Sequence, residues 1–147
     1  MIHGSYPPIL PPKVFAYGFS LRKRALVRRF VGNVEVKFIR YTKHLTSEDT
    51  LLLWGSSPTP PNLDKDVQLI RLEDGFLRSV GLGADLVKPV SWVIDKRGIY
   101  YDASKPSDLE YLLQNTEFSN DLLERAASLR QRIVTSGLTK YNVGSTI

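Results

Sequence analysis

The residues best suited to chemistry lie together in one short segment, 71–83. This segment contains two adjacent carboxylates, Glu73 and Asp74, together with three glycines and Arg78. A carboxylate next to a bound sugar can act as a general base toward a hydroxyl group, and an arginine can bind a carboxylate or a phosphate through two parallel hydrogen bonds. The alternative interpretation is a turn held by ion pairs, with no catalytic role.

The two carboxylates are expected to have different roles. Side chains of successive residues at a strand end point to opposite faces, so Glu73 and Asp74 do not both address one ligand unless the chain turns between them. One carboxylate would face the ligand, and the other would anchor the loop through Arg71 or Arg78. The sequence leaves open which of the two faces the ligand.

Other kinds of site are excluded or disfavoured by the residues present. There are no cysteines, and the two histidines, His3 and His44, lack metal-ligand spacing, so we expect no metal site. Neither a GxGxxG motif nor a P-loop occurs. Tyr100 and Tyr101 could stack on a sugar or pack at the rim of the core. Aromatic residues inside apolar runs, Trp54 and Trp92, are expected in the core.

The positive charge of the chain is concentrated in its first third. Residues 13–44 carry nine of the 20 lysines and arginines and a single acid. Five of these bases fall in one predicted helix: Arg22, Lys23, Arg24, Arg28 and Arg29. Such a surface attracts polyanions, whether nucleic acid, anionic lipid headgroups or a phosphorylated sugar carrier. The alternative is a solvated face that keeps the protein soluble.

Strand-like and helix-like patterns alternate along the chain. Short apolar runs predict five strands, at 14–19, 34–39, 50–55, 67–72 and 90–95. Three helices are predicted, over 21–31 after a Ser20 cap, from Pro106 as first residue, and from a Ser119 cap to about Ser136. Their expected buried faces comprise Leu21, Ala25, Leu26, Phe30 and Val31 in the first, Leu109, Leu112 and Leu113 in the second, and Leu122, Ala126, Leu129 and Ile133 in the third.

This alternation predicts an α/β fold with a Rossmann-like parallel sheet flanked by helices. We expect an extended lead-in at 1–12, one domain at 13–137 and the start of a linker at 138–147. Ligands of such folds bind beyond the carboxyl ends of the strands. The sequence shows neither a transmembrane segment nor a signal peptide, which predicts a cytoplasmic protein.

Three separated motifs resemble a known family. Residues 72–79 read LEDGFLRS, residues 98–110 read GIYYDASKPSDLE and residues 138–142 read LTKYN, with Trp54-Gly55 upstream. Together they resemble the capsular polysaccharide biosynthesis proteins of the KpsC type over roughly residues 14–143. Residues 17–20 and the basic helix look most like the second of the two tandem transferase modules in such proteins.

The resemblance implies a retaining glycosyltransferase that moves β-linked Kdo, an acidic eight-carbon sugar, from CMP-Kdo to a lipid-linked acceptor built on lysophosphatidylglycerol. It implies no cofactor besides the donor substrate, a GT-B-like module of two Rossmann domains, and a peripheral position at the inner membrane with the capsule assembly and export machinery. No nucleic-acid partner is implied. This chain would be the acceptor-side half of a module. The catalytic nucleophile is expected downstream of residue 147, so the chain alone is expected to be inactive.

The same resemblance assigns roles to individual residues. Glu73 would be the acceptor-side catalytic carboxylate, supported by Asp74, and Arg78 would bind the Kdo carboxylate. The implied substrate-binding residues are Gly75, Phe76, Arg78, Ser79, Tyr101, Lys140 and Asn142. The five bases of the first helix form an anionic-surface site that would suit an anionic, lipid-linked acceptor at the inner membrane surface. An apolar interdomain face is expected around Phe76, Leu77 and Val80.

Two other functions stay open from the sequence. The chain could be a non-catalytic α/β domain that binds a glycan or an anionic lipid. It could also bind nucleic acid through the basic helix, although it contains no RNP pair or helix-turn-helix motif.

Overall fold

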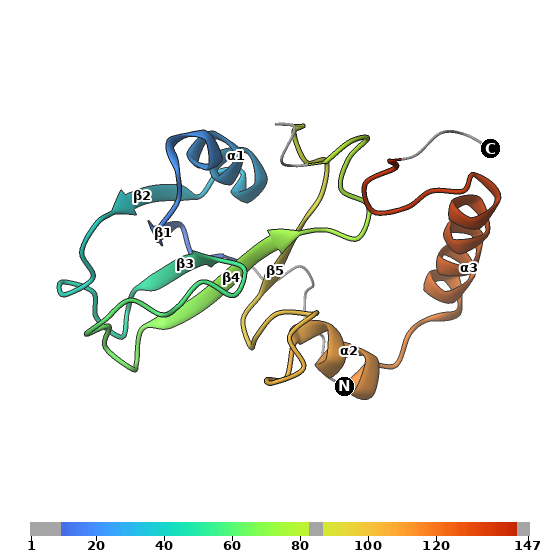
Figure 1. Ribbon diagram of the computed structural model, residues 1–147. Helices are drawn as coiled ribbons and strands as arrows, with labels where there is room; N and C mark the ends of the chain where they lie inside the picture. The colour runs from blue at the N-terminus through green and yellow to red at the C-terminus, as the bar shows by residue number, and fades with distance from the viewer. Residues whose placement is uncertain (1–9, 83–86, 144–147) are drawn as a thin grey trace. The chain divides into compact units, whose positions relative to one another are not determined.

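A computed structural model describes residues 10–82 and 87–143 (Figure 1). Most of the predicted lead-in, Gly83 and the end of the predicted linker therefore lie outside the described residues. The chain forms two compact units, which we describe separately. Unit 1 contains the chain up to Glu73 together with Ile94–Tyr111, and unit 2 contains Asp74–Val93 and the chain from Leu112 onward.

The five predicted strands form one sheet in the order β2-β1-β3-β4-β5. Their bounds are Lys13–Tyr17 for β1, Glu35–Ile39 for β2, Thr50–Trp54 for β3, Gln68–Asp74 for β4 and Trp92–Asp95 for β5. β1 pairs in parallel with both β2 and β3, and β3 pairs in parallel with β4. The fold is therefore α/β with a mostly parallel sheet, as predicted.

The strand register brings the carboxyl ends of the strands to one edge of the sheet. Tyr17, the last residue of β1, is paired with Ile39, the last residue of β2. Trp54, the last residue of β3, is paired with Leu72 of β4. The segments that follow these strands therefore emerge at the same edge, where ligands of open α/β sheets bind.

The core of unit 1 lies on both faces of its central strands. Phe15, Leu45, Leu51, Leu53 and Val67 form one buried cluster. Other strand residues, namely Val14, Ala16, Leu52, Ile70 and Leu72, are also buried. Burial of consecutive residues in β3 explains its unbroken apolar run, because a central parallel strand is covered on both faces.

Helix α1 has the predicted bounds, Leu21–Val31. Ser20 caps it as predicted, and its side chain accepts a hydrogen bond from the backbone amide of Lys23 at 3.4 Å. The helix stops at Gly32, which has a φ of 67°. A left-handed conformation of this kind favours glycine.

The predicted buried face of α1 is partly wrong. Val27 and Val31 are the buried residues, whereas Leu21 is 82% exposed and Ala25 is exposed. The reason lies in the basic residues, since Lys23 and Arg24 pack on aromatic rings of the sheet and turn the helix so that Leu21 points to solvent.

The start of α2 also differs from the prediction. The helix spans Asp108–Asn115, and Ser107 caps it, because the Ser107 hydroxyl accepts a hydrogen bond from the Glu110 amide at 3.1 Å. Pro106 therefore precedes the cap and is not the first helical residue. A serine that satisfies an amide of the first turn decides the start of this helix.

Helix α3 spans Asn120–Thr135 with the predicted Ser119 cap. The predicted buried stripes of α2 and α3 are wrong in the described part of the chain, where neither helix has a buried residue. Leu113, Leu122 and Leu129 are exposed, and Leu109, Leu112 and Ile133 are half-buried. Helical periodicity predicts that these residues share a face but not that another element covers it.

Both tryptophans are half-buried rather than in the core. The Trp54 ring contacts Phe19 edge-on, with the Lys23 ammonium 3.3 Å from its centroid. Trp92 donates from its indole nitrogen to Asp74. Each half-buried indole thus has a polar or charged neighbour.

Candidate functional site

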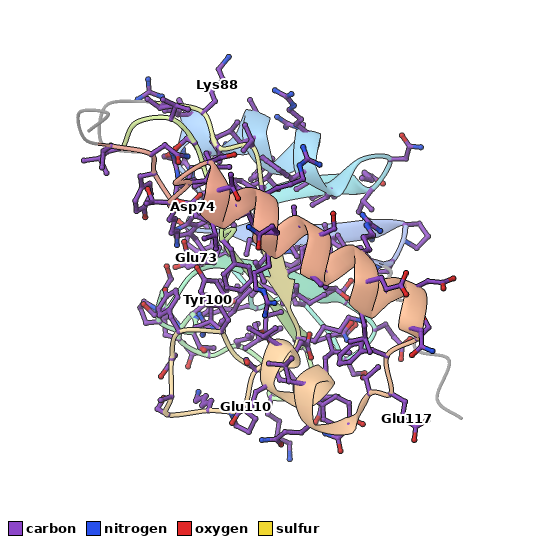
Figure 2. The ribbon with its side chains drawn as sticks, turned by 90° about the vertical axis from the view of Figure 1, so that its right-hand side faces the viewer. Glu73, Asp74, Lys88, Tyr100, Glu110 and Glu117 are labelled. Carbon is purple, nitrogen blue, oxygen red and sulfur yellow. The ribbon has the colours of Figure 1, made fainter. Side chains whose placement is uncertain are left out.

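The first group of candidate residues is in unit 1, at the end of β4. This strand extends two residues beyond its predicted end, so that Glu73 is part of the strand. The Tyr101 hydroxyl donates a hydrogen bond to Glu73 Oε2 at 3.0 Å. Figure 2 labels Glu73 and Tyr100, whose ring packs edge-on against that of Tyr101. Two of the predicted site residues, Glu73 and Tyr101, are therefore in direct contact.

The backbone of Gly55 lies close to both Glu73 and Tyr101. Gly55 has a φ of 48°, and a Cβ atom at this position would lie 2.7 Å from Glu73 Oε2 and 3.2 Å from the Tyr101 hydroxyl. Arg71 Nη1 donates to the carbonyls of Gly55 at 2.6 Å and Ser57 at 2.9 Å. Arg71 therefore fixes the turn after β3 rather than a carboxylate. Glycine is required here because any side chain would displace the Glu73 carboxylate.

Burial and the Glu73 carboxylate raise the pKa of Tyr101 above its ordinary value of 10.0. Loss of solvent is the larger cause, and the hydrogen bond and charge of Glu73 add to it, while hydrogen bonds with Ser56 act in the opposite direction. Each of the raising effects disfavours the phenolate. Tyr101 therefore stays a neutral hydrogen-bond donor to Glu73 well above neutral pH.

An alkaline titration tests this environment. A pKa raised in the folded state stabilises the protein fully below 10.0, and this contribution is lost as the pH rises through the folded pKa. The tyrosinate absorbance of wild type minus that of Tyr101→Phe is expected to show one phenol with a midpoint above 10.0, and Glu73→Gln is expected to lower that midpoint. Tyr41→Phe serves as the matched control at an exposed tyrosine. A difference curve centred at or below 10.0 would contradict the geometry.

The second group is a buried network in unit 2. Arg78 Nε lies 2.7 Å from Asp74 Oδ2, and the two side chains are 8% and 17% exposed. Arg78 Nη1 donates to Ser79 Oγ at 2.8 Å and to the Val87 carbonyl at 3.1 Å. The indole nitrogen of Trp92 donates to Asp74 Oδ1 at 3.2 Å. Asp74 is thus the carboxylate that anchors the loop, and Arg78 is its partner.

The segment after α3 is bound to the same loop. The Lys140 carbonyl accepts hydrogen bonds from the amides of Arg78 and Ser79, and Asn142 Nδ2 donates to the Ser79 carbonyl at 3.0 Å. Asn142 Oδ1 accepts from the Thr139 amide at 2.9 Å, and Thr139 Oγ1 accepts from the Asn142 amide. The structure therefore brings Lys140 and Asn142 to Arg78 and Ser79, through backbone and amide groups that hold the loop in place.

Two further predicted site residues lie in this loop. Gly75 donates from its amide to the Ser91 carbonyl at 2.9 Å, and a Cβ atom here would overlap the Ser91 side chain. Phe76 and Val80 are exposed, and Leu77 is half-buried. Gly75 therefore has a packing role in unit 2, and the apolar interdomain face around Phe76 stays a prediction.

Removing the Asn142 side chain is expected to destabilise unit 2. Asn142→Ala deletes the acceptor for the Thr139 amide and the donor to the Ser79 carbonyl, which lies 63 positions away, at an expected cost of about 1–2 kcal/mol in the free energy of unfolding. Urea unfolding monitored by circular dichroism measures this cost. Gln114→Ala, at an exposed position of α2, is the control and is expected to change stability by less than about 0.5 kcal/mol. Equal stability of Asn142→Ala and wild type would contradict the stabilising role of the Asn142 hydrogen bonds.

Sequence reasoning missed one buried carboxylate, Asp95. It is 2% exposed, and its Oδ1 accepts from the amides of Arg97 and Gly98 while its Oδ2 accepts from the Asp108 amide. Asp95 thereby joins the end of β5 to the start of α2. An aspartate followed by Lys-Arg-Gly at a strand end was the available signal, because aspartate commonly bonds to amides two and three residues ahead.

Membrane-spanning helices and metal-binding clusters are both absent from residues 10–82 and 87–143. No helix in these ranges is long and apolar enough to cross a bilayer. Nor do they contain a group of three or more histidine, aspartate or glutamate side chains arranged to hold a metal ion.

This α/β fold, with a carboxylate at the carboxyl end of its fourth strand, matches half of a transferase chain of known structure. Two solved structures from Thermosulfurimonas dismutans are similar over nine-tenths of this chain, the KpsC β-Kdo 2,7 transferase with 34% identity and a TM-score of 0.67, and the KpsC β-Kdo 2,4 transferase with 30% identity and a TM-score of 0.72. The match covers 45% and 43% of those chains.

The family model described as "Capsule polysaccharide biosynthesis protein" matches residues 50–143, and the chain belongs to this family. It is 39% identical over 143 residues to the capsule polysaccharide modification protein LipA of Neisseria meningitidis. It is also 35% identical over 151 aligned residues to the lipopolysaccharide-processing protein LpsZ of Rhizobium meliloti. The matches take in 90% and 92% of this chain but only 20% of LipA and 34% of LpsZ.

Proposed function

We propose that this chain provides the acceptor-side part of a retaining β-Kdo transferase in capsule biosynthesis. The reaction would move Kdo from CMP-Kdo to a lipid-linked, Kdo-terminated acceptor built on lysophosphatidylglycerol. The observation that carries the proposal is the similarity to two KpsC Kdo transferases, which extends over nine-tenths of this chain. Family membership supports the capsule pathway as the setting.

Glu73 is the proposed acceptor-side base. It stands at the carboxyl end of β4, where the fold places ligands, and Tyr101 orients its Oε2 atom by a 3.0 Å hydrogen bond. The carboxylate would take the proton of the acceptor hydroxyl while that oxygen forms its bond to the anomeric carbon of Kdo and the bond from that carbon to the nucleophile of the covalent intermediate breaks. The close approach of Gly55 limits the positions open to this carboxylate.

Arg78 and Asp74 have a positioning role in this proposal. Nε and Nη1 of Arg78 are engaged by Asp74, Ser79 and Val87, and the side chain is buried. The pair shapes the loop that follows β4. This interpretation supports the anchoring alternative for Asp74 and leaves direct binding of the Kdo carboxylate by Arg78 as the less favoured role.

The nucleophile and most donor contacts are proposed to come from the part of the transferase fold that this chain does not match, since the match covers 45% of the solved chain. A covalent glycosyl intermediate needs a nucleophile opposite the leaving group, and rate acceleration depends on holding both reactants near attack distance. A polypeptide of these 147 residues alone is therefore expected to leave CMP-Kdo intact.

A chimeric enzyme tests the proposed function. Residues 13–143 replace the matching segment of the T. dismutans KpsC β-Kdo 2,7 transferase, and Kdo transfer from CMP-Kdo to a Kdo-terminated glycolipid is followed by mass spectrometry. We expect transfer by the chimera and none by the 147-residue chain. A chimera that melts cooperatively but transfers no Kdo would refute the proposed function, and transfer by the chain alone would refute the proposed division of the site.

A further inference from the structure

The exposed face of α1 is a charged surface that the proposed reaction does not use. This face, which we call the basic face, consists of Leu21, Arg22, Ala25, Arg28 and Arg29. The helix carries five basic residues and no acidic residue. The single acid among residues 13–44, Glu35, pairs with Lys37 at 3.5 Å.

The structure divides the five bases of α1 into two sets. Lys23 and Arg24 are half-buried, with Lys23 on the Trp54 ring and Arg24 5.0 Å from the centroid of Phe38. Arg28 also lies over Phe38, at 4.8 Å, but stays exposed. Aromatic rings attract these cations without neutralising them, so the helix keeps its full positive charge.

Apolar side chains are exposed next to this charge. Leu21 is 82% exposed at the start of α1, and Tyr41 is 76% exposed just after β2. Because the last residues of β1 and β2 are register partners, the segments that contain Leu21 and Tyr41 emerge at one edge of the sheet. Exposed leucine and tyrosine among arginines are typical of surfaces that lie in a membrane interface.

We propose that the basic face of α1, together with Tyr41, binds the headgroups of an anionic bilayer. The arginines would contact lipid phosphates, and Leu21 and Tyr41 would enter the boundary between headgroups and acyl chains. Nucleic acid offers the same phosphate chemistry, but it offers no apolar phase for the exposed side chains of Leu21 and Tyr41. The inference is independent of Kdo transfer, and lipid binding is measured without it.

Vesicle sedimentation of the 147-residue protein tests this inference. We expect the protein to sediment with phosphatidylcholine vesicles that contain phosphatidylglycerol, not with pure phosphatidylcholine, and to lose binding as salt rises above about 0.15 M. Replacing Arg22, Arg28 and Arg29 by serine is expected to weaken binding by about 100-fold. Leu21→Ser leaves the charge unchanged and is expected to weaken binding by about 10-fold.

The matched control removes three exposed arginines from α3, Arg125, Arg130 and Arg132, and is expected to retain most of the binding. Circular dichroism checks each variant. If the triple variant on α1 unfolds, the double variant Arg22→Ser with Arg29→Ser replaces it, because this variant keeps the contact of Arg28 with Phe38.

Equal recovery with neutral and anionic vesicles, or equal losses of binding in both triple variants, would overturn the proposal. Tighter binding to random-sequence RNA than to anionic vesicles at the same salt, abolished by the α1 variants, would also overturn it.

Discussion

Glu73→Gln is expected to reduce Kdo transfer by the chimeric enzyme by about 100-fold or more, with little change in its melting temperature. The glutamine side chain keeps the shape of the carboxylate and an oxygen that accepts the Tyr101 hydroxyl at a similar position. It no longer accepts a proton at neutral pH. The loss should therefore fall on turnover, which mass spectrometry of the product under saturating CMP-Kdo measures directly.

The control for this variant is Glu110→Gln, the same chemical change at an exposed position on α2 (Figure 2). It is expected to leave the rate within about twofold of wild type, since surface substitutions outside a site have small effects. A Glu73→Gln chimera with an unchanged rate and a collapsed melting temperature would assign Glu73 a structural role. Tyr101→Phe further distinguishes a catalytic role of Glu73 from a structural one, because loss of the orienting hydroxyl should lower the rate less than loss of the base.

The elements of this fold were predictable where local chemistry decides them. Ser20 and Ser119 were identified as helix caps because a serine hydroxyl can accept from an amide of the first turn, and both do so. The apolar run of β3 indicated a strand covered on both faces, and its first four residues are buried. The fold class followed from the alternation of such segments.

What the sequence left open depended on tertiary contacts. The partner of Asp74 could be Arg71 or Arg78, and the structure assigns Arg78 to Asp74, while Arg71 binds the carbonyls after β3. The hydrogen bond from Asn142 to the Ser79 carbonyl joins residues that are 63 positions apart, a separation over which no local pattern is informative. The orientation of α1 was mispredicted because hydropathy treats Lys23 as a surface residue, whereas it packs on Trp54.

The buried pair of Asp74 and Arg78 gives the largest expected effect on stability. Arg78→Met removes the cation and leaves Asp74 in a mostly buried position with its Trp92 hydrogen bond. Breaking a buried ion pair from one side costs about 3–5 kcal/mol, because the remaining charge has lost its partner but stays out of water. Urea unfolding of the 147-residue protein, followed by circular dichroism, measures this loss.

Two comparisons separate the buried charge from the lost packing. Asp74→Leu combined with Arg78→Met removes both charges, and the double variant is expected to be more stable than Arg78→Met alone, since no unpaired charge stays buried. Lys37→Met breaks the exposed pair of Lys37 and Glu35, in which the two side chains are 53% and 60% exposed, and is expected to cost less than about 1 kcal/mol.

If Arg78→Met costs no more than Lys37→Met, the pair of Asp74 and Arg78 does not hold the loop after β4, and Arg78 becomes a candidate for binding the Kdo carboxylate. If the double variant recovers stability but the corresponding chimera loses Kdo transfer, the network is retained for the shape of the loop rather than for stability.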